Sequence, residues 1–171
     1  AFLREAQVGS VISSDHIVEV ISAGIDQSLG VPWLAMELLN GSDFRDYVAS
    51  HGPLPEDLAA KVLTELFHGV RAAHAAGIVH RDLKPENVFL HFGRQAGGSF
   101  TTKILDFGIA KLISSVTSSN TRSIGTPGWM APEQTAAGVV TAAADVWALC
   151  LIAFYAYTGQ CFWLTLRNPD T

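Results

Sequence analysis

The residues whose types could do chemistry are grouped in the middle of the chain. Asp82 precedes Lys84 by two positions, and residues two apart in an extended segment project to the same side. Asn87 follows them, and Asp106 comes after a strand-like segment. Both supply oxygen ligands of the kind that Mg²⁺ prefers, although neither could hold the metal alone. These four residues are therefore the first candidates for an active site.

Three short motifs contain or follow these residues in a fixed order. Residues 80–87 read His-Arg-Asp-Leu-Lys-Pro-Glu-Asn, residues 106–108 read Asp-Phe-Gly, and residues 131–133 read Ala-Pro-Glu. Each tripeptide recurs by chance, but the combination is specific. The chain resembles the protein kinase superfamily over essentially its whole length. Segments 2–6 and 159–163 are similar in style to bacterial Ser/Thr kinases of the eukaryotic-like type.

The resemblance implies transfer of the ATP gamma-phosphate to Ser or Thr hydroxyls of protein substrates, with ATP and Mg²⁺ as cofactors. Kinases position the hydroxyl and neutralise phosphate charge without a covalent intermediate. Asp82 is expected to accept or orient the hydroxyl proton, and Lys84 to lie against the transferring phosphate. Asn87 and Asp106 are expected to bind Mg²⁺. Lys84 is typical of Ser/Thr kinases, and Thr126 is expected to hydrogen-bond Asp82 and Lys84.

The same resemblance implies an ATP-binding segment near residue 37. Met36 is expected to lie behind the adenine, and the backbone groups of Glu37 and Leu39 to pair with it. Phe89 is expected below the purine, and Asp43 is expected to reach the ribose. Two alternatives stay open. The apolar residues near position 37 and Phe89 could be ordinary core residues, because such residues look the same without a nucleotide. Asp43 could be an acid that the helix dipole stabilises at the start of a helix.

Other residues are expected to support or regulate the site. His80 and Phe107 resemble two stacked residues of the kinase regulatory spine, and Gly108 completes the Asp-Phe-Gly motif. Asp145 resembles the buried acid that hydrogen-bonds the catalytic-loop backbone. The remaining histidines show no metal-ligand spacing and are interpreted as surface or hydrogen-bonded core residues.

Residues 114–123 are rich in Ser and Thr and lack a core-forming pattern, so they are expected to form a mobile activation loop. Arg81 and Lys111 resemble two basic contacts for a loop phosphate, which adds about −1.5 to −2 charge. We therefore expect activation by phosphorylation at one or more of Ser118, Ser119 and Thr121. The alternative is that this stretch is only a polar linker.

Hydrophobic periodicity predicts the elements that position these residues. Strands are expected at 17–25, 31–39, 88–91 and 102–105. Ser42 is expected to cap a short helix that runs through residue 49, and a long helix is expected to begin near Pro53 and stop at Gly77. Its apolar stripe comprises Leu58, Val62, Leu63, Leu66, Phe67 and Val70. A further helix is expected at 142–157.

The expected fold class is α+β, a protein-kinase-like fold that is mostly the helical C-terminal lobe. Residues 1–36 are interpreted as a remnant of the N-lobe, 37–42 as the hinge, and 43–171 as a C-lobe truncated before its last helices. The Gly-rich loop and the lysine that grip phosphate are expected before Glu5, and the usual arginine partner of Glu133 beyond the last residue. Without the loop and the lysine, we expect the chain alone to have little kinase activity.

Composition excludes some function classes. With 11 Lys and Arg against 16 Asp and Glu, the net charge of −5 argues against nucleic-acid binding. The longest apolar run, residues 146–157, is too short to span a bilayer and is interpreted as a buried core helix. Cys150 and Cys161 are interpreted as buried, reduced thiols, which fits a cytoplasmic protein.

Two other function classes stay open beside an active Ser/Thr kinase. A non-catalytic, kinase-like binding module would often have lost Asp82 or Asp106, and this chain keeps both. A small-molecule phosphotransferase similar to the aminoglycoside kinases would usually lack the combination of motifs found here.

Overall fold

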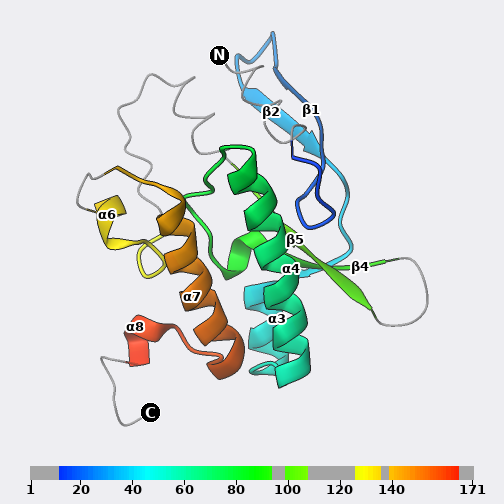
Figure 1. Cartoon of the computed structure of the whole chain (residues 1–171). Helices are drawn as coiled ribbons and strands as arrows, with labels where there is room; N and C mark the ends of the chain where they lie inside the picture. The colour runs from blue at the N-terminus through cyan, green and yellow to red at the C-terminus, as the bar shows by residue number, and fades with distance from the viewer. Residues whose placement is uncertain (1–11, 94–98, 108–125, 136–138, 166–171) are drawn as a thin grey trace.

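The computed structural model describes residues 12–93, 99–107, 126–135 and 139–165. Two long helices lie side by side at its centre, with a two-stranded sheet at one end of the molecule (Figure 1). A second sheet of three strands packs against one of the long helices. The fold is therefore mixed helix and sheet, with most of its mass in the helical part.

The two sheets are both antiparallel. Strand β1 (Val20–Ile25) pairs with β2 (Pro32–Met36) through a short turn. The second sheet has the order β3-β4-β5, formed by β3 (Gly41–Asp43), β4 (Val88–Phe92) and β5 (Phe100–Ile104). The strand predictions are confirmed for β1, β2, β4 and β5, with shifted ends, whereas β3 was not predicted.

The helical part is built on α4 (Glu56–Ala75) and α7 (Ala142–Thr158). Thr141 caps the start of α7, and Gly159 ends it with φ 68°, a left-handed conformation that glycine adopts at little cost. The other helical segments of the described residues are short: α3 (Phe44–His51), η1 (Pro85–Asn87), α6 (Pro132–Thr135) and α8 (Phe162–Thr165). Within the described ranges, none of the helices has both the length and the apolar character needed to cross a membrane.

The segment before β1 joins the two parts of the molecule. The Val18 N–H donates to the Ile104 carbonyl (3.0 Å), and the Ile104 N–H donates to the His16 carbonyl (2.9 Å). A Cβ at Gly69 of α4 would lie 2.7 Å from the Ile104 side chain and 3.0 Å from the His16 carbonyl oxygen. A side chain at this position would therefore require the Ile104 side chain and the segment at His16 to shift, which glycine avoids.

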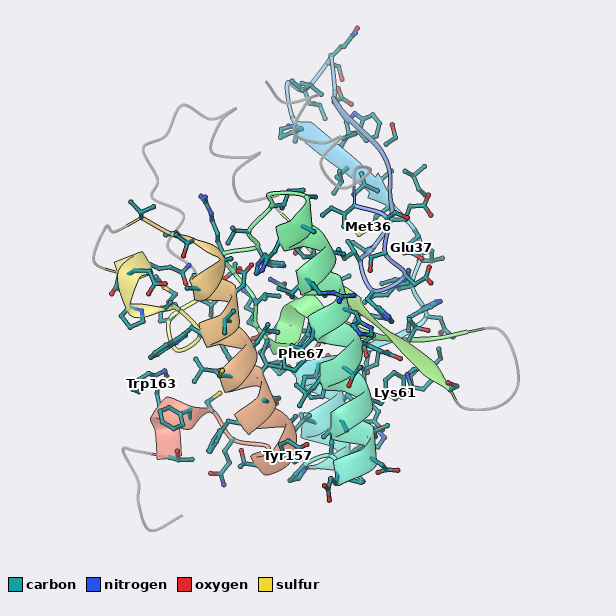
Figure 2. The ribbon with its side chains drawn as sticks, viewed as in Figure 1. Met36, Glu37, Lys61, Phe67, Tyr157 and Trp163 are labelled. Atoms are coloured by element: carbon teal, nitrogen blue, oxygen red, sulfur yellow. The ribbon has the colours of Figure 1, made fainter. Side chains whose placement is uncertain are left out.

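Several local predictions were wrong. The cap of α3 is Asp43, which accepts the Asp46 N–H (2.9 Å), and not Ser42. Phe67 does not belong to the buried stripe of α4, because its side chain is 46% exposed (Figure 2). Cys150 is exposed on α7 and Cys161 is half-buried. Val146 and Tyr157 are also exposed, so only one side of the apolar run is core.

Candidate active site

The segment that carries Asp82 is attached to α7 by one buried carboxylate. Asp145, 1% exposed, accepts the N–H of His80 (2.9 Å) and the N–H of Arg81 (2.8 Å). The same carboxylate lies 2.7 Å from Nε2 of His74 at the end of α4. Because backbone N–H groups cannot rotate away, these bonds fix the approach of the chain to Asp82.

The buried ring of His80 bridges the segment that carries Asp82 and the residue that follows β5. Its Nε2 lies 2.8 Å from the Leu105 carbonyl, which can only accept, so Nε2 carries the proton. Nδ1 is then free to accept the Asp82 N–H (3.3 Å). Burial lowers the pKa of His80, so the neutral ring that this arrangement requires is the stable form. The ring also meets Phe107 edge-on, with 4.6 Å between the ring centroids.

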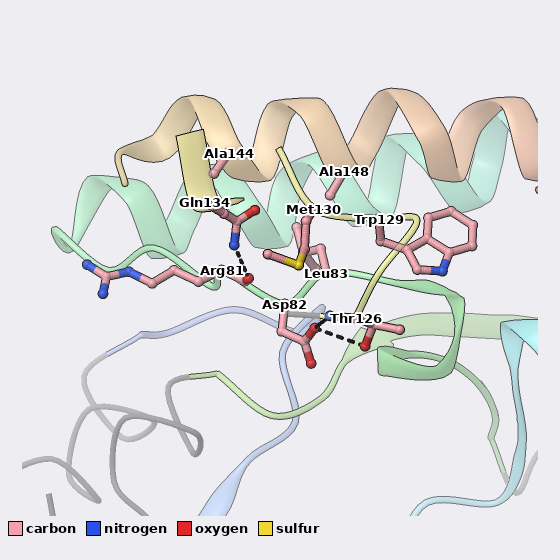
Figure 3. Close-up of a pocket in the computed structure, with 9 residues that line it drawn as sticks. All are labelled: Arg81, Asp82, Leu83, Thr126, Trp129, Met130, Gln134, Ala144 and Ala148. Atoms are coloured by element: carbon pink, nitrogen blue, oxygen red, sulfur yellow. Dashed lines mark hydrogen bonds between the residues drawn. The ribbon is translucent and has the colours of Figure 1, made fainter. Parts of the chain in front are cut away.

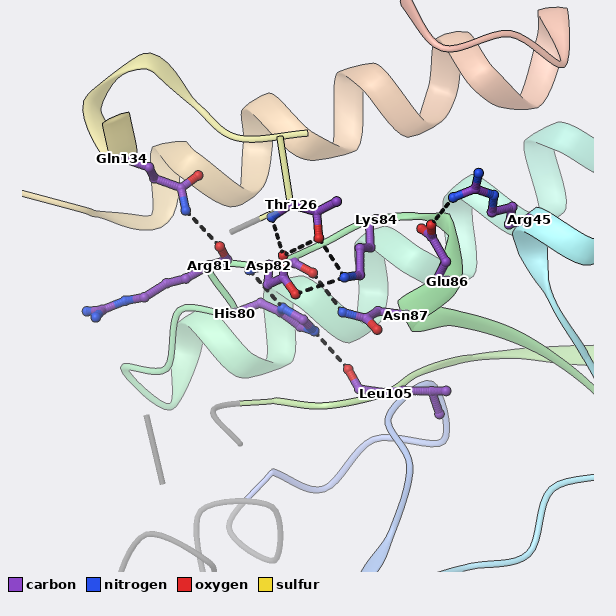
Figure 4. A network of polar contacts seen from close by, with 10 residues as sticks. All are labelled: Arg45, His80, Arg81, Asp82, Lys84, Glu86, Asn87, Leu105, Thr126 and Gln134. Carbon is purple, nitrogen blue, oxygen red and sulfur yellow. Dashed lines mark hydrogen bonds and ion pairs between the residues drawn. The ribbon is translucent and has the colours of Figure 1, made fainter. Parts of the chain in front are cut away.

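Asp82, Lys84 and Thr126 form a closed polar triangle (Figure 4). Oδ1 of Asp82 accepts the N–H (3.0 Å) and the hydroxyl (3.2 Å) of Thr126. The Lys84 ammonium donates to the same hydroxyl (2.6 Å) and lies 3.2 Å from Oδ2 of Asp82. The carboxylate is therefore held in one orientation beside a positive charge, although part of it remains open to solvent.

Two residues of the site have backbone conformations that side chains other than glycine rarely adopt. Arg81 has φ 72° and Asp106 has φ 60°. Such conformations cost roughly 1–3 kcal/mol each and persist only where surrounding contacts impose them. At Arg81 these contacts include the bond from its own N–H to Asp145. The strain lies at the residues that set the directions of the two candidate catalytic acids.

Asn87 and Asp106 have the chemistry of magnesium ligands. The Asn87 side chain donates from Nδ2 to the Asp82 carbonyl (2.8 Å), which leaves its oxygen as the ligand atom. Asp106 is exposed at the turn that follows β5. Among the described residues there is no cluster of three or more His, Cys, Asp or Glu that could hold a metal. Mg²⁺ keeps water and substrate phosphates as ligands, so one carboxylate and one amide suit it.

Two of the candidate nucleotide-binding residues, Asp43 and Phe89, share one face of the three-stranded sheet. Asp43 pairs with Phe89, and Phe89 pairs with Lys103, so their side chains lie in a row. Lys103 extends to the carboxylate of Glu37, which follows β2 (Figure 2). This row therefore connects the end of β2 with the site. Met36, the last residue of β2, is partly exposed.

The backbone of the segment predicted to be the hinge makes few hydrogen bonds within the described residues. The Glu37 N–H donates to the Glu19 carbonyl (2.9 Å), and no backbone hydrogen bond between described residues involves Leu39. The Glu37 carboxylate also accepts the Glu19 N–H (2.9 Å). Burial acts to raise the pKa of Glu37, but the hydrogen bonds from Lys103 and Glu19 lower it overall, so this residue stays charged.

A small pocket lies beside Asp82, between the catalytic segment, residues 126–130 and α7 (Figure 3). Its lining combines Asp82 and Thr126 of the polar triangle with apolar side chains of α7 and of the segment after Thr126. The lining residues are Arg81, Asp82, Leu83, Thr126, Trp129, Met130, Gln134, Ala144 and Ala148.

Some predicted residues are not brought into the site. Glu133 is partly exposed, and no basic side chain of the described ranges lies within ion-pair distance of it. The following predicted residues lie outside the described residues: Glu5, Gly108, Lys111, Ser118, Ser119 and Thr121.

Two contacts of the site were missed by sequence reasoning. His74 was interpreted without a carboxylate neighbour, yet it contacts Asp145, which is 71 positions away in the chain. Lys103 was read only as part of a strand, although it pairs with Glu37. A histidine in the last turn of a helix is a weak signal of a nearby anion, and the alternation along β5 is compatible with a Lys103 side chain beside Phe89.

The chain is similar to known proteins over nearly its whole length. The family model described as protein kinase domain matches residues 1–170. The chain is 39% identical over 161 residues to the serine/threonine-protein kinase Pkn1 of Myxococcus xanthus, covering 93% of this chain and 22% of that protein. It is 36% identical over 160 residues to the serine/threonine-protein kinase PkaA of Streptomyces coelicolor, covering 93% of this chain and 28% of that protein.

The chain is also similar to a solved structure. The PknI kinase domain of Mycobacterium tuberculosis is similar with a TM-score of 0.73 and 30% identity, covering 94% of this chain and 55% of that one. The chain thus spans about a quarter of the length of these two curated relatives and about half of the solved domain.

Proposed function

The chain belongs to the protein kinase domain family, and from that premise we propose that the intact protein transfers the ATP gamma-phosphate to Ser or Thr hydroxyls of protein substrates. The observation that carries this proposal is the triangle of Asp82, Lys84 and Thr126, because it holds a partly exposed carboxylate in one orientation beside a cation, as transfer of phosphate to a hydroxyl requires. A non-catalytic module has no need of this arrangement. In this proposal residues 1–36 belong to the N-lobe, 37–42 to the hinge and 43–171 to the C-lobe.

The chain's own residues would act mainly by positioning. Asp82 would accept a hydrogen bond from the substrate hydroxyl and direct its oxygen toward the gamma phosphorus. It can take up the hydroxyl proton as the new oxygen–phosphorus bond forms and the bond from phosphorus to the departing ADP oxygen breaks. Thr126 keeps the carboxylate in this orientation. Lys84 places positive charge where the transferring group gains negative charge, which favours the transition state.

ATP and Mg²⁺ are proposed cofactors. Asn87 and Asp106 would hold the metal, which neutralises phosphate charge when it is bound. Met36 and Phe89 would enclose the adenine, with the Glu37 carbonyl and the Leu39 backbone as its hydrogen-bond partners. Asp43 already caps α3 with Oδ1, so a ribose contact would use its other oxygen.

The proposed activity predicts a defined product. The intact protein, incubated with Mg-ATP and a generic protein substrate, should yield phosphoserine or phosphothreonine and essentially no phosphotyrosine. Phosphoamino-acid analysis of the labelled substrate measures this directly. Intact protein that binds Mg-ATP but labels no protein would contradict a kinase and favour a binding module, while labelling of small hydroxylated compounds alone would favour the small-molecule alternative.

We also propose that phosphorylation at Ser118, Ser119 or Thr121 activates the intact protein. Arg81 supports this because it is exposed next to Asp82, and no carboxylate of the described ranges pairs with it. A phosphate there would gain charge-assisted hydrogen bonds. Alanine at all three positions should strongly reduce activity, and mass spectrometry of the wild type after incubation with ATP should find the phosphate. Full activity of the triple variant would exclude this switch.

A further inference from the structure

Gln134 makes two side-chain hydrogen bonds that no role described so far accounts for. It lies on α6, immediately after Glu133, and Oε1 accepts the Ala131 N–H (2.9 Å). Nε2 donates to the Arg81 carbonyl (2.7 Å), as Figures 3 and 4 show. Since an N–H can only donate and a carbonyl can only accept, these two partners determine which end of the amide points where.

The first of these bonds has a local explanation. Gln134 is the third residue of α6, counted from Pro132, and a Gln or Glu at this position commonly reaches back to the N–H of the residue that caps the helix. The bond to Ala131 is such a contact. The bond to Arg81 is not, because Arg81 is 53 positions away and belongs to the catalytic segment.

The second bond acts on the peptide group that leads into Asp82. A peptide group is planar, so its carbonyl and its N–H turn together. In the Arg81–Asp82 peptide the carbonyl is held by Gln134 (2.7 Å) and the N–H by His80 Nδ1 (3.3 Å). The preceding N–H groups, of His80 and Arg81, are held by Asp145. Gln134 thus supplies the only side-chain contact to the Arg81 carbonyl among the described residues.

We infer that Gln134 is a positioning residue for the catalytic acid: its amide donor sets the plane of the Arg81–Asp82 peptide and so the direction of the Asp82 side chain. The contact also ties α6, which follows the segment carrying Thr126, to the catalytic segment. Asp82 is therefore oriented from both sides, at its carboxylate by Thr126 and at its backbone by Gln134. This inference rests on the proposed kinase function.

Gln134→Glu separates the two bonds. A carboxylate at this position still accepts the Ala131 N–H and suits the start of a helix, so α6 keeps its cap. It has no donor for the Arg81 carbonyl and places an acceptor against it. Gln134→Met has a similar length but removes both bonds. Gln27→Glu, in the exposed turn between β1 and β2, makes the same chemical change away from the site.

In the intact protein, we expect Gln134→Glu to lower kcat roughly 10-fold to 100-fold, because small displacements of a positioned catalytic group have effects of this size. The KM for Mg-ATP should stay within about twofold, since no proposed nucleotide contact changes. Hydrogen exchange should become faster in a peptide covering residues 78–83 and stay unchanged in one covering 129–133. Gln134→Met should speed exchange in both peptides, and Gln27→Glu should match the wild type.

A kcat of the Gln134→Glu variant equal to that of the wild type, or unchanged exchange at residues 78–83, would overturn the inference and leave Gln134 as a helix cap only. The inference would also fail if the Gln134→Glu variant were less stable to heat than the wild type but had the same kcat per nucleotide-binding site. If the wild type transfers no phosphate, the kinase proposal fails, and the exchange measurement alone then decides whether Gln134 holds the peptide.

Discussion

Asp82→Asn in the intact protein should lower turnover by roughly 10²- to 10⁴-fold, the range expected when a general base is lost. The substitution keeps the shape of the side chain, and an amide oxygen can still accept the bonds from Thr126. The other end of the amide would point its N–H₂ at the Lys84 ammonium. In the wild type this ammonium lies 3.2 Å from a carboxylate oxygen of Asp82. The substitution therefore removes both the proton acceptor and the carboxylate that pairs with Lys84.

Nucleotide affinity separates this effect from a general loss of structure. Asp82 is not among the proposed ATP or metal contacts, so the dissociation constant of Mg-ATP should change little. Asp106→Asn should instead weaken Mg-nucleotide binding, because it removes a charged metal ligand. Measurements of kcat at saturating Mg-ATP and of nucleotide binding by calorimetry test both statements. Turnover unchanged in Asp82→Asn would show that the base is assigned to the wrong residue.

Asp145→Asn should lower the free energy of unfolding by about 1–3 kcal/mol, the cost typical of leaving a buried hydrogen-bond donor without an acceptor. The carboxylate of Asp145 accepts the N–H groups of His80 and Arg81 on different oxygens. An asparagine has one acceptor oxygen, so one backbone N–H would face an amide N–H₂. The ring of His74 can change tautomer in response, but a backbone N–H can only donate.

A loss of this size is a large fraction of the 5–15 kcal/mol that stabilises a typical domain. Urea unfolding should therefore show a much lower midpoint with an unchanged m-value. Asp15→Asn makes the same substitution at an exposed site and should leave the midpoint in place. Equal midpoints for the two variants would mean that Asp145 carries little of the stability of the catalytic segment.

Long elements with a strong local pattern were predictable from the sequence. The helix expected at 142–157 is α7 (Ala142–Thr158), and the strands expected at 88–91 and 102–105 are β4 and β5, with shifted ends. The three-residue strand β3 was missed because it contains Gly41 and polar residues, and it is a strand only through its pairing with β4. Ser42 and Asp43 are both good capping residues, so sequence could not choose between them.

Which side of a helix is buried was less predictable. The sequence of α7 is apolar nearly all round, so periodicity does not show which face meets the core. Packing against α4 buries Ala148, Leu151 and Ile152 and leaves Cys150 exposed. The prediction of a buried thiol at Cys150 was wrong for that reason. The predicted burial of Phe67 was also wrong, because its side chain lies on the exposed side of α4.

The sequence by itself determined the family, the order of the motifs and the types of residue available for chemistry, because these are properties of the chain read in order. Only the tertiary structure decided which of them meet. Asp82 contacts Thr126 across 44 positions, Asp145 contacts His80 across 65, and Gln134 contacts Arg81 across 53. Spacing along the chain constrains only near neighbours. Contacts at these separations arise when helices and sheets pack to bury their apolar faces, and that packing brings the polar groups of the site together.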